Sequence, residues 1–109
     1  MKVSLTPEQL LPIINSYIKS SYKGYSWNKK GDLYVFGNQK GDYIIEYNQH
    51  FTGNPNILYI DENFYVGIKR SIPLDRERLY DALAKWTENE LNLRVGIILP
   101  SNILRFIRI

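Results

Sequence analysis

Aromatic and basic side chains alternate in one short stretch of the chain, SSYKGYSWNKKG, residues 20–31. Its aromatic and basic members are Tyr22, Lys23, Tyr25, Trp27, Lys29 and Lys30. Aromatic rings stack on nucleic-acid bases while lysines hold phosphates. Tyrosine and tryptophan are also the residues that contribute most binding energy at protein interfaces. We predict that this segment contacts a protein partner or a nucleic acid, unless Tyr25 and Trp27 fold inward and close the core beside a helix.

Acidic residues gather further along the chain. Residues 42–63 contain Asp42, Glu46, Asp61 and Glu62 but neither lysine nor arginine. Such a block can mimic the charge of a nucleic acid toward a basic partner, so Asp61 and Glu62 join the predicted binding residues. Metal-dependent nuclease chemistry needs several converging carboxylates, and the Asp61-Glu62 pair falls at an expected turn. We therefore predict no metal site.

Residue patterns for catalysis are absent from the sequence. The only histidine, His50, lies near a loop, and no neighbouring pattern supplies the partner that a general base needs for orientation. Neither a phosphate-binding glycine motif nor a nucleophile elbow occurs. We predict no catalytic residues and no cofactor. A metal-independent ribonuclease, which needs only Arg, Lys, Tyr and Glu, is the one enzyme class that the composition leaves open.

The composition is that of a globular domain. The chain has 109 residues, 44% of them hydrophobic, a net charge of +3 and no cysteine. This length fits one domain, residues 1–109, and the lack of cysteine excludes disulfides and thiolate metal sites. No apolar run approaches the ~20 residues of a membrane span, and the first residues lack the apolar core of a signal peptide. We therefore expect a cytoplasmic protein without membrane contact.

Helix signals occur at two places. Thr6 and Gln9 form a capping box around Pro7, which predicts a helix from there to Ser21–Gly24. Pro12 removes a donor inside this helix, so we expect either a kink there or a helix that begins near Pro12. A second helix is expected from Asp75 to residues 89–92, with an apolar stripe of Leu79, Ala82, Leu83 and Trp86.

Six short strands are expected around these helices. Lys-Gly-Asp occurs twice, at residues 30–32 and 40–42, and each copy is interpreted as a turn that leads into a strand. The expected strands cover residues 33–36, 43–47, 57–60, 64–69, 93–99 and 103–109, with Asp61-Glu62-Asn63 as a hairpin turn. The order α-ββββ-α-ββ predicts an α+β domain with one antiparallel sheet of five or six strands and two helices.

The run of residues 95–99 is apolar enough to predict a central strand, buried on both faces. Arg105 and Arg108 mark the last strand as an edge. Through that edge, residues 103–109 could pair with a second copy of the chain and form a homodimer.

Small size, missing catalytic residues and abundant tyrosine together favour a non-enzymatic protein-binding module. The predicted role is an inhibitor that blocks a partner protein, either an immunity protein against a toxin or a phage- or virus-encoded inhibitor of a host defence system. The alternatives are a nucleic-acid-binding protein that uses residues 22–30 with Arg105 and Arg108, and a small metal-independent ribonuclease toxin.

Overall fold

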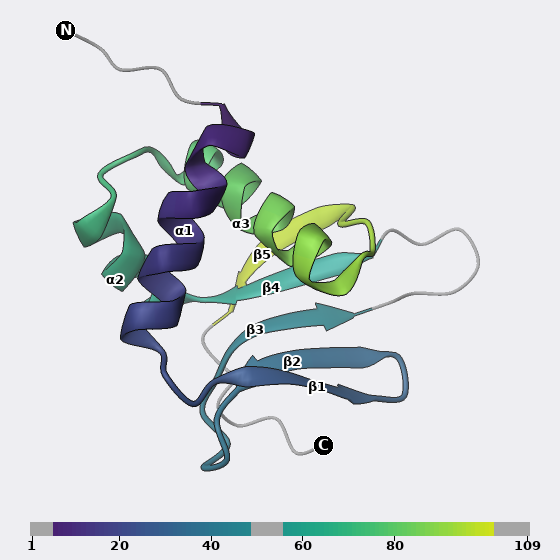
Figure 1. Ribbon diagram of the computed structural model, residues 1–109. Helices are drawn as coiled ribbons and strands as arrows, with labels where there is room; N and C mark the ends of the chain where they lie inside the picture. The colour runs from purple at the N-terminus through teal and green to yellow at the C-terminus, as the bar shows by residue number, and fades with distance from the viewer. Residues whose placement is uncertain (1–5, 49–55, 102–109) are drawn as a thin grey trace, which may run out of the picture.

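Three helices and five strands make up the part of the chain that the structure, a computed structural model, describes, namely residues 6–48 and 56–101. In chain order they are α1 Pro7–Ser21, β1 Ser26–Lys30, β2 Leu33–Gly37, β3 Tyr43–Asn48, β4 Ile57–Asp61, α2 Glu62–Ser71, α3 Arg76–Leu91 and β5 Ile97–Ser101. The helices gather on one side of the sheet (Figure 1). The predicted α+β class is therefore confirmed.

The five strands lie in the sheet in the order in which they follow one another in the chain. β1, β2, β3 and β4 pair antiparallel, whereas β5 runs parallel to β4. A parallel pair needs a long crossover connection, and α2 with α3 supplies it. The sheet is thus mixed, and the order within it follows directly from the local connections.

Aromatic rings join the sheet to the helices. The ring of Trp86 on α3 lies 5.3 Å from that of Phe36 on β2 and 6.0 Å from that of Trp27 on β1. Its indole N–H donates to Oδ1 of Asn15 at 3.1 Å, which ties α3 to α1. These contacts fix the layer of helices over the first two strands.

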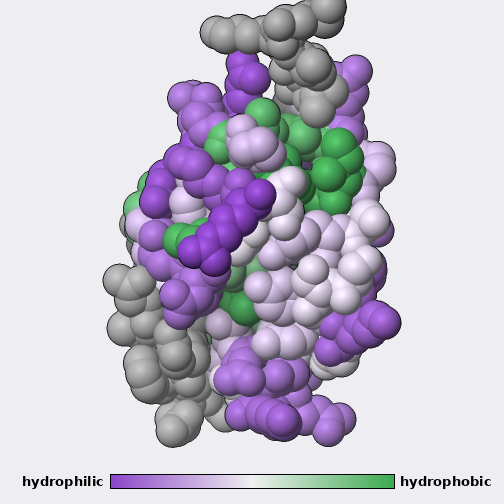
Figure 2. All heavy atoms as spheres, turned by 90° about the vertical axis from the view of Figure 1, so that its left-hand side faces the viewer, coloured by the Kyte–Doolittle hydropathy of each residue, from purple (hydrophilic) through white to green (hydrophobic). Residues whose placement is uncertain are grey.

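Seen from the side of α2, the surface is mostly hydrophilic, with apolar residues confined to patches (Figure 2).

The first helix begins as the sequence predicts. The side chain of Thr6 accepts the N–H of Gln9 at 3.2 Å, and Oε1 of Gln9 accepts the N–H of Thr6 at 2.8 Å. The two Lys-Gly-Asp copies do lead into adjacent antiparallel strands, β2 and β3. Gly31, with a φ of +61°, lies in the two-residue connection between β1 and β2, where the left-handed conformation is needed.

Strand β1 was not predicted. Ser26, Asn28 and Lys29 give it the composition of a surface loop, and Trp27 is its one apolar member. The structure pairs Trp27 with Phe36, so that β1 becomes the edge strand of the sheet. A half-buried edge strand needs few apolar side chains, because only one of its faces meets the core.

The predicted hairpin around Asp61 is wrong. Oδ2 of Asp61 accepts the N–H of Phe64 at 3.1 Å and caps α2, which replaces the expected strand at residues 64–69. Phe64, Tyr65 and Ile68 are buried on one side of this helix, whereas Val66 is 43% exposed. Alternating apolar residues over so short a segment fit a strand and a helix equally well, and the cap decides.

The C-terminal prediction is also wrong in part. The structure places β5 at the edge of the sheet, with Ile97 and Leu99 about 40% exposed. It is therefore not the doubly buried central strand that its apolar run indicates. Residues 103–109, with Arg105, Arg108 and the proposed homodimer edge, lie outside the described residues, as does His50.

Glu46 is a buried carboxylate in the middle of the sheet. It lies on β3 between Val35 and Tyr59, is 5% exposed, and its Oε1 has no hydrogen-bond partner among the described residues. Burial raises the pKa of its carboxyl group, because the charged form loses hydration. The charged carboxylate is therefore less stable in the folded protein than it is in water.

We predict that Glu46→Gln raises the free energy of unfolding at neutral pH, by on the order of 1 kcal/mol. Below the ordinary carboxyl pKa the group is neutral in both folded and unfolded states. The penalty grows as pH rises from that ordinary pKa to the raised folded pKa, because the unfolded chain loses its proton first, and it is complete above the folded pKa. The advantage of the variant should therefore shrink as pH falls from about 8 to about 4. Urea unfolding across this range measures it, with exposed Glu90→Gln as the control. The prediction is contradicted if the free energies of unfolding of Glu46→Gln and the wild type differ by the same amount at every pH, or if their difference shrinks toward high pH.

Candidate functional site

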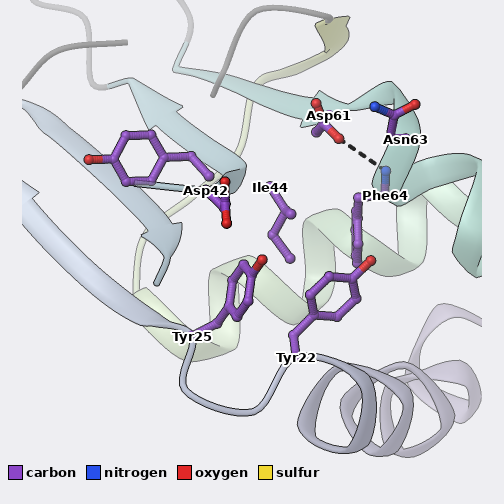
Figure 3. Close-up of a pocket in the computed structure, with 8 residues that line it drawn as sticks. Tyr22, Tyr25, Asp42, Ile44, Asp61, Asn63 and Phe64 are labelled. Atoms are coloured by element: carbon purple, nitrogen blue, oxygen red, sulfur yellow. Dashed lines mark hydrogen bonds between the residues drawn. The ribbon is translucent and has the colours of Figure 1, made fainter. Parts of the chain in front are cut away.

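A pocket of about 210 Å³ lies where the α1–β1 connection, the start of β3 and the start of α2 meet (Figure 3). Aromatic rings and acidic or amide side chains contribute most of its wall. We call it the aromatic-acidic pocket; its lining residues are Tyr22, Tyr25, Asp42, Tyr43, Ile44, Asp61, Asn63 and Phe64.

Tyr22 and Tyr25 are held by the turn that ends α1. Tyr22 is the C-cap residue and donates its N–H to Ile18, and the N–H of Tyr25 returns to the carbonyl of Tyr22 at 3.2 Å. The two rings meet edge to face with centroids 5.0 Å apart, and Tyr22 meets Phe64 at 5.3 Å. Because each ring packs against the next, the aromatic wall is fixed before any ligand arrives.

Each of the two carboxylates is held by its own local hydrogen bonds. Nδ2 of Asn38 donates to Oδ2 of Asp42 at 3.1 Å, while its Oδ1 accepts the N–H groups of Lys40 and Asp42 at 3.0 Å. Asp61 is fixed by its capping bond to Phe64. In Figure 3 Asp42 and Asp61 lie on one side of the pocket and the rings of Tyr22 and Tyr25 on the other.

The pocket is electrically negative. Burial raises the pKa of Tyr25, and the charges of Asp42 and Asp61 raise it further. Burial likewise raises the pKa of Tyr22 to about 12, with added contributions from Tyr17, Tyr25 and Asp61. Both phenols stay protonated because a phenolate would face these carboxylates. Among the described residues no lysine or arginine side chain lines the pocket, so a cation is the ligand that it favours.

A second cluster of tyrosines and a carboxylate lies near the pocket in the sequence, and an arginine of the same chain occupies it. The guanidinium of Arg76 is 4.2 Å from the ring centre of Tyr65 and 5.4 Å from that of Tyr80. Its Nη1 pairs with Oε1 of Glu62 at 2.9 Å. Glu62, one of the predicted binding residues, is therefore already paired with a cation of its own chain.

The structure brings together three of the predicted binding residues, Tyr22, Tyr25 and Asp61. Lys23 is exposed beside them. Trp27 and Lys29 belong to β1, where Lys29 lies over the ring of Tyr34 at 5.4 Å. Lys30 closes the same strand, and its side chain lies outside the description. The alternating segment therefore divides between the pocket and the sheet.

The predicted binding residues do not include five of the lining residues or a neighbouring groove. The five are Asp42 and Asn63, which the sequence places in turns, and Tyr43, Ile44 and Phe64, which it places in strands. The acidic block at residues 42–63 could have indicated Asp42, and the helix N-cap pattern at Asp61 could have indicated Phe64.

A second, polar groove of about 340 Å³ lies along β1 and β2, lined by Ser26, Asn28, Val35, Gly37, Asn38, Gln39 and Tyr43.

Within residues 6–48 and 56–101, no group of three or more His, Cys, Asp or Glu residues could hold a metal ion. No helix there is long and apolar enough to cross a membrane. Comparison of the chain with family models, with curated proteins and with solved structures gives no match. Its function must therefore be inferred from its own residues.

Trp27 tests whether the aromatic-basic segment is core or contact surface. We predict that Trp27→Ala lowers the free energy of unfolding by roughly 2–3 kcal/mol, because its ring packs on Phe36 and Trp86 while part of it remains accessible. Trp27→Phe should lower the free energy of unfolding by less, because it keeps an aromatic ring and removes a buried indole N–H that has no partner among the described residues. Chemical denaturation measures both. Unchanged stability in Trp27→Ala would assign the ring to a binding surface instead.

Proposed function

We propose that this protein is a small non-enzymatic binding module that blocks a partner protein by accepting a basic side chain in the aromatic-acidic pocket. One observation carries the proposal. Two carboxylates and two tyrosines in edge-to-face contact line the same pocket, and none of the described residues that line it is basic.

The size of the pocket supports a side chain as its occupant. Sites for small molecules and cofactors usually measure ~300–1,000 Å³. At about 210 Å³ this pocket is smaller, and it suits the tip of one long side chain. Protein interfaces gain most of their binding energy from a few such anchors that enter preformed pockets.

Rigidity supports the same conclusion. The ring of Tyr22 packs against those of Tyr25 and Phe64, and the hydrogen bonds of Asn38 fix Asp42. Side chains that are already ordered lose little conformational entropy on binding, so that more of the contact energy becomes affinity.

Charge indicates the kind of partner. Asp42 and Asp61 both belong to the acidic block at residues 42–63, and a basic protein surface is complementary to it. Proteins that act on nucleic acids carry such surfaces. We therefore propose that the module is an inhibitor of a nucleic-acid-acting protein in the cytoplasm, as an immunity protein against a toxin or as a phage- or virus-encoded inhibitor of a host defence system.

We predict that Asp42→Asn weakens binding of the partner by a factor of about 10–30, as loss of an interface hot spot does. The partner is captured from cells of the native host or of its competitors with the immobilised protein, and its affinity is measured by calorimetry. Asn keeps an acceptor for Asn38, so the loop should survive the substitution. Asp32→Asn, which removes an exposed carboxylate outside the pocket, is the matched control and should bind like the wild type.

Equal affinities of Asp42→Asn and the wild type would contradict the proposal. So would micromolar binding of labelled single-stranded or duplex nucleic acid whose affinity falls steeply with salt, because that slope reports released counterions. Such binding would indicate a nucleic-acid-binding protein that uses the exposed Lys23 and Lys29.

A further inference from the structure

We infer that the aromatic-acidic pocket is a guanidinium subsite, so that the basic side chain it accepts is an arginine in preference to a lysine. This inference rests on the proposed function and adds to it the chemical identity of the anchor. It depends on the shapes of the two cations, which differ although their charges do not.

The arrangement of donors and acceptors favours arginine. Asp42 and Asp61 come from different elements, and the tyrosine rings lie opposite them (Figure 3). A guanidinium is flat, carries five N–H donors in one plane, and stacks on aromatic rings while those donors serve carboxylates. A lysine ammonium is a compact, strongly hydrated charge that gains less from a ring and from a second carboxylate.

Asp61 offers an acceptor that the chain itself does not use. Its side chain is only 7% exposed, and Oδ2 is committed to the N–H of Phe64. Among the described residues Asp61 has neither a second hydrogen bond nor a basic partner. An entering guanidinium would supply N–H donors and an opposite charge to this carboxylate.

The chain shows the same recognition once within itself. Arg76 stacks over Tyr65 at 4.2 Å and pairs through Nη1 with Glu62 at 2.9 Å, and the same nitrogen donates to the hydroxyl of Tyr80 at 2.8 Å. The aromatic-acidic pocket has the corresponding groups, with two carboxylates and the rings of Tyr22 and Tyr25. It therefore has what an arginine from another protein requires.

The test is an NMR titration of the whole chain with N-acetyl-arginine methylamide and, separately, with the corresponding lysine compound. One side chain alone should bind only in the millimolar range. We expect the backbone amide signals of Asn63 and Phe64 and the ring signals of Tyr25 to shift, with the arginine compound binding at least about fivefold more tightly. Asp42→Asn should remove the preference, whereas Asp32→Asn should leave it intact.

Guanidinium chloride and magnesium chloride serve as further probes. Saturable shifts with low concentrations of guanidinium at the same residues support the inference. Equal or tighter binding of the lysine compound overturns it, as do shifts produced by magnesium alone. A preference for the arginine compound that persists undiminished in Asp42→Asn also overturns it, because it places the source of the preference outside the pocket.

Failure of this inference can be told apart from failure of the proposed function. If Asp42→Asn weakens the captured partner while the arginine compound shows no preference, the binding module stands and the guanidinium subsite does not. With the partner in hand, replacing its interface arginines by lysine one at a time gives a second measurement. One such replacement should lower affinity by about tenfold or more, and no effect at any position contradicts the inference.

Discussion

The hydrogen bond from the Phe64 N–H to the carboxylate of Asp61 is the interaction on which most of this structure depends. It ends β4 and begins α2 at the same residue, so the chain leaves the sheet toward the helical side. An N-cap of this kind typically stabilises a helix by ~1 kcal/mol, but its position matters more than its strength. α2 and α3 then form the crossover after which β5 runs parallel to β4 at the edge of the sheet. The same bond places Asp61, Asn63 and Phe64 together at the mouth of the aromatic-acidic pocket.

A second constraint acts at the opposite end of the sheet. The rings of Trp27, Phe36 and Trp86 lie within 6.0 Å of one another across β1, β2 and α3. They hold the edge strand against the helical layer, and the chain enters that strand directly after Tyr25. The turn that carries the two pocket tyrosines is thereby fixed from both sides, by α1 before it and by β1 after it. The aromatic residues of the segment thus divide their roles between core packing and the pocket wall.

Much of this fold could be predicted from local signals, and the failures have physical causes. The capping box at Thr6, the apolar stripe of α3 and the turns before β2 and β3 are encoded within a few residues, and the structure has them all. Residues 64–69 were misassigned because a short amphipathic segment fits two periodicities, and Asp61 suits a turn as well as a cap. The edge position of β5 depends on a crossover that no local pattern specifies. For the site, residue types indicated Tyr22, Tyr25 and Asp61, but only tertiary packing could show that Asp42 and Phe64 join them.

The central claim is that one pocket, built from three separate parts of the chain, is where a partner protein binds. Cross-saturation NMR of the labelled protein in complex with its captured partner tests this most directly. Signal loss should centre on the backbone amides of Tyr25, Asp42 and Asn63 and fade toward β5. Loss centred on Ile97 and Leu99, with the pocket amides unaffected, would assign binding to the exposed sheet edge and contradict the claim.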